Sequence, residues 1–108
     1  MKKSQTFTPP PAVAAMAEKG LELRRKFKRG GTMVGVARAR DLKNRRAVSA
    51  RTIMRMFSYF SRHMIDKRSA YFGNETKPSK GYIAWLLWGG DPGMRWCYEI
   101  RQKLLKEK

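Results

Sequence analysis

The sequence predicts an all-α protein, a compact bundle of four or five short helices around a buried helix rich in tryptophan. Three observations lead to this prediction. Apolar residues recur at three- and four-residue spacing through most of the chain, as on one face of an α-helix. Residues that cap helices stand just before these segments. No segment alternates apolar and polar residues as a half-buried strand does, and the sequence has no internal repeat.

The first ten residues are expected to form a flexible arm, basic and rich in proline, ahead of a single helical domain over residues 11–108. A run of prolines ends at Pro11, which lacks an amide proton and therefore suits the first position of a helix. The apolar positions of this first helix are Val13, Met16, Ala17, Gly20, Leu23 and Phe27. The pair Gly30-Gly31 is expected to end it, after a run of cations that suits the negative end of the helix dipole.

A second, shorter helix is expected from its cap, Thr32, to about Lys43. Its inner side is expected to hold Met33, Val36, Ala37 and the stem of Arg40. Its exposed side is expected to show Arg38 and Lys43. A basic turn of Asn44, Arg45 and Arg46 follows, in which asparagine can take the left-handed conformation.

The stretch Val48–Asp66 organises the rest of the chain, because it predicts a helix with two opposed faces. Ser49 can cap this helix, since its hydroxyl can accept an unpaired amide proton of the first turn. One face is apolar and consists of Ile53, Met56, Phe57, Phe60 and Met64. The opposite arc consists of Arg51, Arg55, Ser58 and Arg62, with Tyr59 at its edge and His63 at the other border. The apolar face requires a protein core, so the arginine face is the candidate for function.

A polar loop is expected after this helix, and two further helices follow the loop. Ser79 can cap the first of them, an apolar segment that contains Trp85 and Trp88 and that a glycine pair ends. This segment is too short to span a membrane, and its boundaries favour a helix over a buried strand. Asp91 and Pro92 are expected as the cap and the first residue of a terminal helix. The inner stripe of that helix is expected to comprise Trp96, Cys97, Ile100, Leu104 and Leu105.

The positive charge of the chain predicts an anionic partner. There are 25 Lys and Arg residues against 8 Asp and Glu, which gives a net charge of +17 and an isoelectric point near 10.9. Self-repulsion at this charge opposes compaction, so nucleic acid is the first candidate partner, an anionic membrane surface the second and an acidic protein the third. The arginine content favours phosphate, which a guanidinium group can bind through two oxygens. The apolar helix faces are needed for the core, so we expect no membrane partner.

The sequence does not predict an enzyme, a cofactor or a metal site. His63 and Asp66 are one helical turn apart, but a border histidine on an amphipathic helix is far more often structural. The single cysteine, Cys97, excludes an internal disulfide, and its inner position predicts a buried thiol and not a nucleophile. The N-terminus lacks the apolar run of a signal peptide, so we expect a cytoplasmic protein.

Two stretches resemble a short module of tailed-bacteriophage and prophage proteins. The first is Lys77–Trp96, which contains the run Trp-Leu-Leu-Trp-Gly-Gly-Asp-Pro; the second is Gly30–Leu42, which begins Gly-Gly-Thr. The resemblance covers nearly everything from Leu21 to Trp96. It implies a viral origin, with a location in the host cytoplasm or the virion, and it supplies no catalytic residues.

Residues 48–55 are also similar to the opening of a helix-turn-helix recognition helix, in which a Val-Ser pair precedes a Thr-aliphatic pair and a basic residue. This resemblance implies that the residues nearest the base edges are Ala50, Arg51, Met54 and Arg55. The sequence departs from the motif, because residues 44–47 contain no glycine and Ala37 is about five residues too far upstream.

We therefore predict a small nucleic-acid-binding protein, with DNA favoured over RNA, that binds through its arginine-rich helix face. Phosphate contacts are expected to supply most of the affinity. The candidate binding residues are Arg51, Arg55, Arg62, Ser58, Tyr59, Arg45, Arg46, Lys43 and Arg38. The alternative is a phage structural or interaction protein that docks an acidic host or capsid surface. It would serve as a virion component or as an inhibitor of a host nucleic-acid-binding protein.

Overall fold

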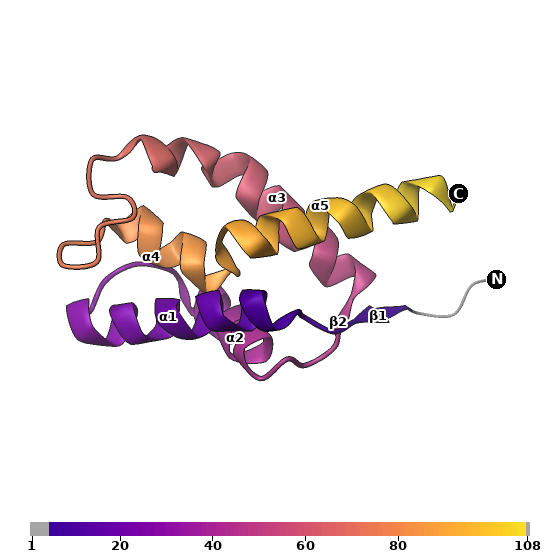
Figure 1. The fold of residues 1–108 in the computed structure, drawn as a ribbon, viewed down its shortest axis with the longest axis horizontal. Helices are drawn as coiled ribbons and strands as arrows, with labels where there is room; N and C mark the ends of the chain where they lie inside the picture. The colour runs from indigo at the N-terminus through magenta and orange to yellow at the C-terminus, as the bar shows by residue number, and fades with distance from the viewer. Residues whose placement is uncertain (1–4, 108) are drawn as a thin grey trace.

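A computed structural model describes residues 5–107 and confirms the all-α fold (Figure 1). α4 contacts each of the other four α-helices and therefore lies at the centre of the bundle. α1 packs against α2 and α4, and α3 packs mainly against α5. The described elements are β1 (Thr6–Phe7), α1 (Pro11–Phe27), α2 (Met33–Lys43), β2 (Val48–Ser49), α3 (Ala50–His63), the 3-10 helix η1 (Met64–Arg68), α4 (Lys80–Leu87) and α5 (Gly90–Lys106).

Hydrogen bonds confirm three of the predicted helix caps. The hydroxyls of Thr32, Ser49 and Ser79 each accept the backbone N–H of the third residue that follows, at 3.2, 3.1 and 3.0 Å. Each bond satisfies one of the first-turn amides that have no partner inside their own helix. Pro11 is the first residue of α1, as its missing amide proton predicts.

The turn after α2 differs from the prediction. The left-handed residue is Arg45, with φ of 52°, whereas Asn44 has φ of −87°. The Arg45 Nε donates a hydrogen bond of 2.7 Å to the carbonyl of Pro9, which ties this turn to the segment before α1. A long-range contact therefore sets the conformation of Arg45, and a local rule for asparagine does not detect it.

The start of α5 also differs from the prediction. Gly89 is its cap and Gly90 its first residue, so Asp91 is not the cap. The Asp91 carboxylate instead accepts the indole N–H of Trp85 at 2.9 Å and pairs with Lys67 at 2.8 Å. The carboxylate thus gives a largely buried indole N–H its hydrogen-bond partner, which a capping pattern in the sequence cannot reveal.

The core is built around α4. Trp85 is 1% exposed, and Phe60 of α3 meets it edge-on with 4.8 Å between the ring centres. Gly20 lets α1 approach α4 closely, because a Cβ atom at this position would lie 2.8 Å from the backbone nitrogen of Leu87. The predicted core role of Trp85 is confirmed, whereas Trp88 is only half-buried.

Five residues predicted to face inward are exposed. In α2, Met33 is 71% exposed and Ala37 and Arg40 are also exposed, because the buried stripe consists of Gly35, Val36, Ala39 and Leu42. Met64 is 44% exposed because α3 ends before it and η1 begins. Leu105 is 45% exposed, since the last turns of α5 project beyond the other helices (Figure 1).

A short antiparallel ladder joins the residues before α1 to the start of α3. Thr6 pairs with Ser49 and Phe7 pairs with Val48, and Pro9 is fully buried. The described part of the predicted arm, residues 5–10, is therefore held against the helices, while residues 1–4 lie outside the described residues. Strands of two residues are too short to produce an alternating pattern, so the sequence gives no sign of them.

Candidate nucleic-acid interface

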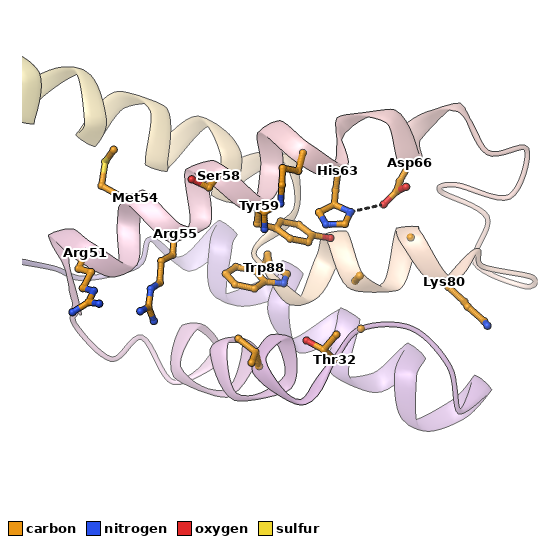
Figure 2. A pocket seen from close by; sticks show the side chains of 15 residues that line it. Thr32, Arg51, Met54, Arg55, Ser58, Tyr59, His63, Asp66, Lys80 and Trp88 are labelled. Atoms are coloured by element: carbon orange, nitrogen blue, oxygen red, sulfur yellow. Dashed lines mark hydrogen bonds and ion pairs between the residues drawn. The ribbon is translucent and has the colours of Figure 1, made fainter.

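A groove with a volume of about 960 Å³ lies beside the arginine face of α3 (Figure 2). α3 forms one wall with the four predicted residues Arg51, Arg55, Ser58 and Arg62. The opposite wall comes from the starts of α2 and α4 and includes Gly31, Thr32, Val34, Lys80 and Gly81. The sequence predicts that these four residues share one face of a helix. The structure places that face in a concave site with two walls.

The three arginines of this wall are available to an anion. Arg51 and Arg55 extend from α3 toward α2 (Figure 2), and all three side chains are exposed. Across residues 5–107, none of the three forms an ion pair with an acidic side chain. The row from Arg51 to Arg62 is about 16 Å long at the rise of an α-helix. It presents unneutralised guanidinium groups that can bind phosphate through charge-assisted hydrogen bonds.

The opposite wall is also electropositive. Two helices begin there, α2 after the cap Thr32 and α4 at Lys80. The N-terminus of a helix carries a partial positive charge, and neither helix has an acidic residue in its first turn to offset it. The ammonium group of Lys80 adds a full charge. An anionic chain in this groove would therefore meet positive potential on both sides.

Stacked aromatic rings form the floor of the groove (Figure 2). Tyr59 stacks on His63 with 4.5 Å between ring centres and on Trp88 with 4.7 Å. Tyr59 is 5% exposed, and burial raises the pKa of its hydroxyl, so the phenol stays neutral. The prediction that groups Tyr59 with the exposed arginine arc is therefore wrong about its exposure, because Trp88, the residue after α4, covers this flank of α3.

Four other predicted binding residues do not line the groove: Arg38, Lys43, Arg45 and Arg46. The Arg38 side chain is only 15% exposed and lies over the Trp88 ring, 5.7 Å from the ring centre to the guanidinium carbon. Arg45 is bonded to Pro9. Lys43 and Arg46 are exposed, but Lys43 lines a different hollow between α1 and α2. Of the predicted cations, only Arg51, Arg55 and Arg62 line the groove.

The second wall of the groove cannot be identified from the sequence. The cap Thr32 and a helix start after Ser79 are both evident there, so the local signals are present. Which helix starts face the α3 arginines depends on how the helices pack together in the bundle. No local sequence pattern predicts this arrangement. Lys80 is the clearest omission, because it is a charged residue that lines the groove.

The structure also shows the surroundings of the side chains that could take part in acid–base or nucleophilic chemistry, the His63–Asp66 pair and Cys97. At the Lys80 end of the groove, the His63 Nδ1 is 3.2 Å from the Asp66 Oδ2 (Figure 2). Burial raises the pKa of the Cys97 thiol to about 12, so the thiol is protonated at neutral pH. Within the described range, no cluster of three or more His, Cys, Asp and Glu side chains is arranged to hold a metal ion.

Comparison with protein-family models, curated proteins and solved structures gives no match. No helix within residues 5–107 is long and apolar enough to cross a membrane. α2 and α3, the two helices that the helix-turn-helix resemblance concerns, contribute to opposite walls of the groove. Reading of base edges by the start of α3 stays a prediction.

Proposed function

We propose that this protein binds nucleic acid, with DNA as the preferred ligand, by holding one sugar-phosphate backbone in the groove beside α3. The observation that supports this most strongly is the row of Arg51, Arg55 and Arg62, which forms no ion pair within residues 5–107 and faces a second electropositive wall. A guanidinium row in a concave site suits a flexible, evenly charged chain of phosphates. At 3.4 Å of helix axis per phosphate on each strand of a duplex, a row of about 16 Å corresponds to roughly five phosphates.

The groove favours contacts to the backbone over contacts to the bases. Proteins that bind single strands through their bases offer free aromatic faces on which bases stack. Here both neighbours of the Tyr59 ring are other rings, at 4.5 and 4.7 Å between centres, so this ring has no free face for a base. The affinity is therefore expected to depend mainly on phosphate contacts and to vary little with base sequence.

A salt titration with matched charge variants tests the proposal. The test variant replaces Arg51, Arg55 and Arg62 by Gln, which keeps helix propensity and removes three charges from the groove. The control variant replaces Arg95, Lys103 and Lys106 by Gln; these residues are exposed on α5 and do not line the groove. Binding to duplex DNA, single-stranded DNA and RNA is measured by fluorescence anisotropy at several salt concentrations.

We expect log K to fall linearly with log salt for the unchanged protein. The groove variant should reduce the slope by about three units on duplex DNA and about two on a single strand, and the control should change it much less. Equal losses in both variants would mean that the charge acts diffusely and that the groove is not the site. Absence of binding at low salt would refute the proposal. Circular dichroism confirms that each variant is folded.

A second candidate function is docking to an acidic protein, as a virion component or as an inhibitor of a host nucleic-acid-binding protein. The observation that favours it is the apolar side chains near the arginines: Met33, Val34 and Met54 are 71%, 61% and 37% exposed, and Val34 and Met54 line the groove. An acidic protein helix could use both kinds of contact, whereas phosphates use only the cations. Substituting Met54 by Ser would weaken binding to an acidic protein and leave the affinity for nucleic acid unchanged. The viral origin that the sequence resemblance implies is compatible with either function and stays a prediction.

A further inference from the structure

We propose that the bound strand continues past the groove onto the loop between α1 and α2, where Arg25, Lys28 and Arg29 form a second phosphate-binding site. This inference rests on the proposed function and extends the same binding path. A hollow of about 460 Å³ lies at this loop, lined by Arg24, Arg25, Lys28, Arg29, Gly30 and Gly31. Gly31 also lines the groove, so the two concavities adjoin.

The loop is fixed in place against α4. Gly30 has φ of 89°, and a Cβ atom there would lie 2.7 Å from the Cβ of Ile83 and 3.1 Å from the carbonyl oxygen of Lys80. The Arg24 Nε donates a hydrogen bond of 3.0 Å to the carbonyl of Gly30. The loop therefore lies next to Lys80, the residue that carries positive charge at this end of the groove. Such a fixed loop loses little freedom when it binds a strand.

The charges of these three cations are not neutralised by acidic side chains within residues 5–107. Arg25, Lys28 and Arg29 are exposed, and across the described residues none of them pairs with an acid. The helix dipole accounts for Arg25, which lies in the last turn of α1. It does not account for Arg29, which lies beyond the cap residue Lys28. Lys28 is itself left-handed, with φ of 54°, and its backbone N–H donates to the carbonyl of Arg24, so it closes α1 and turns the chain toward Arg29.

A length-dependent binding experiment tests the second site. Oligothymidylates of five and fifteen nucleotides are used, because a short strand can bind along the α3 row alone, whereas a much longer strand can also reach the loop. The loop variant replaces Arg25, Lys28 and Arg29 by Gln and retains Arg24, which holds the loop. It is compared with the α3 variant and the α5 control described above, each of which also removes three charges.

We expect the loop variant to reduce the salt slope for the fifteen-nucleotide strand by about two units and to leave the five-nucleotide strand within about twofold in affinity. The α3 variant should weaken both strands. A loop variant that weakens both lengths equally, or that weakens the longer one no more than the α5 control does, overturns the inference and leaves the proposed function intact. If the α3 variant also has no effect, the proposed function fails and the inference fails with it. A helical circular dichroism spectrum and a cooperative melting transition show that the loop variant is folded.

Discussion

At the scale of single residues, Asp91 connects three elements through one carboxylate. It accepts the indole N–H of Trp85 on α4 and pairs with Lys67 of η1, while it lies in the first turn of α5. Partial burial disfavours the ion, but the hydrogen bonds from Lys67 and Trp85 outweigh it and hold the pKa of Asp91 below its usual value. A folded-state pKa below the unfolded value of 3.8 means that ionised Asp91 stabilises the fold.

The pH dependence of this stabilisation can be predicted. It is fully present above the unfolded pKa of about 3.8 and is lost as the pH falls through the lower folded pKa. We expect Asp91→Asn to lower the free energy of unfolding at pH 7 by about 0.5 to 1 kcal/mol, since the pair is half-exposed and screened. The difference between the two proteins should shrink below about pH 4. Urea unfolding at pH 7 and at acid pH measures both quantities, and a difference that stays constant into acid would show that the charge of Asp91 is not involved.

At the scale of the elements, the loop between α1 and α2 has a glycine pair for two separate reasons. Both glycines have positive φ, which disfavours any residue with a Cβ atom. Gly30 also lies so close to Ile83 that a Cβ atom would overlap the α4 side chain. Gly73, in the loop before α4, has a similar φ of 86° but nothing within 4 Å of the position of a Cβ atom. An added Cβ atom would therefore meet conformational strain alone at Gly73, and both strain and overlap with α4 at Gly30.

Substituting each glycine by alanine tests this separation. Gly73→Ala should lower the free energy of unfolding by about 1 to 2 kcal/mol, the cost of a left-handed conformation alone. Gly30→Ala should lower it by about 2 to 4 kcal/mol, because overpacking against α4 adds to the same strain. Thermal and urea unfolding followed by circular dichroism compare the two variants. Equal losses would mean that the loop can move away from α4, which would also remove the fixed geometry on which the second phosphate site depends.

The elements also show which parts of the structure can be predicted from sequence. The caps Thr32, Ser49 and Ser79 are predicted correctly because a cap depends on a hydroxyl and an amide three residues apart. Asp91 has the same local pattern, but its long-range bond to Trp85 overrides it. The inner face of α2 is predicted correctly only at Val36, because its mixture of small, apolar and basic residues defines no clear stripe. The predicted arginine row of α3 lies together, yet its opposite wall depends on packing that only the structure provides.

At the scale of the whole molecule, the positive charge affects folding and binding in opposite ways. The chain has a net charge of +17, and the part that the structure describes extends over 48 × 26 × 21 Å. At about 0.01 M salt the Debye length is roughly 30 Å, so repulsion acts across much of the molecule. At about 0.15 M it is roughly 8 Å, and only neighbouring charges still repel one another. Salt should therefore stabilise the fold while it weakens the proposed binding to phosphate.

This opposition gives the last prediction. Raising NaCl from about 0.01 to 0.15 M should raise the melting temperature by several degrees, because 1 kcal/mol corresponds to about 4–8 °C in a domain near this size. The variant with Gln at Arg51, Arg55 and Arg62 should melt higher than the unchanged protein at low salt and gain less from added salt. Its three lost charges relieve repulsion, and none of them forms an ion pair within residues 5–107 that would be broken. Differential scanning calorimetry measures both effects. A variant that melts lower at low salt would mean that these arginines stabilise the fold, and their exposure in the groove would then not indicate a binding site.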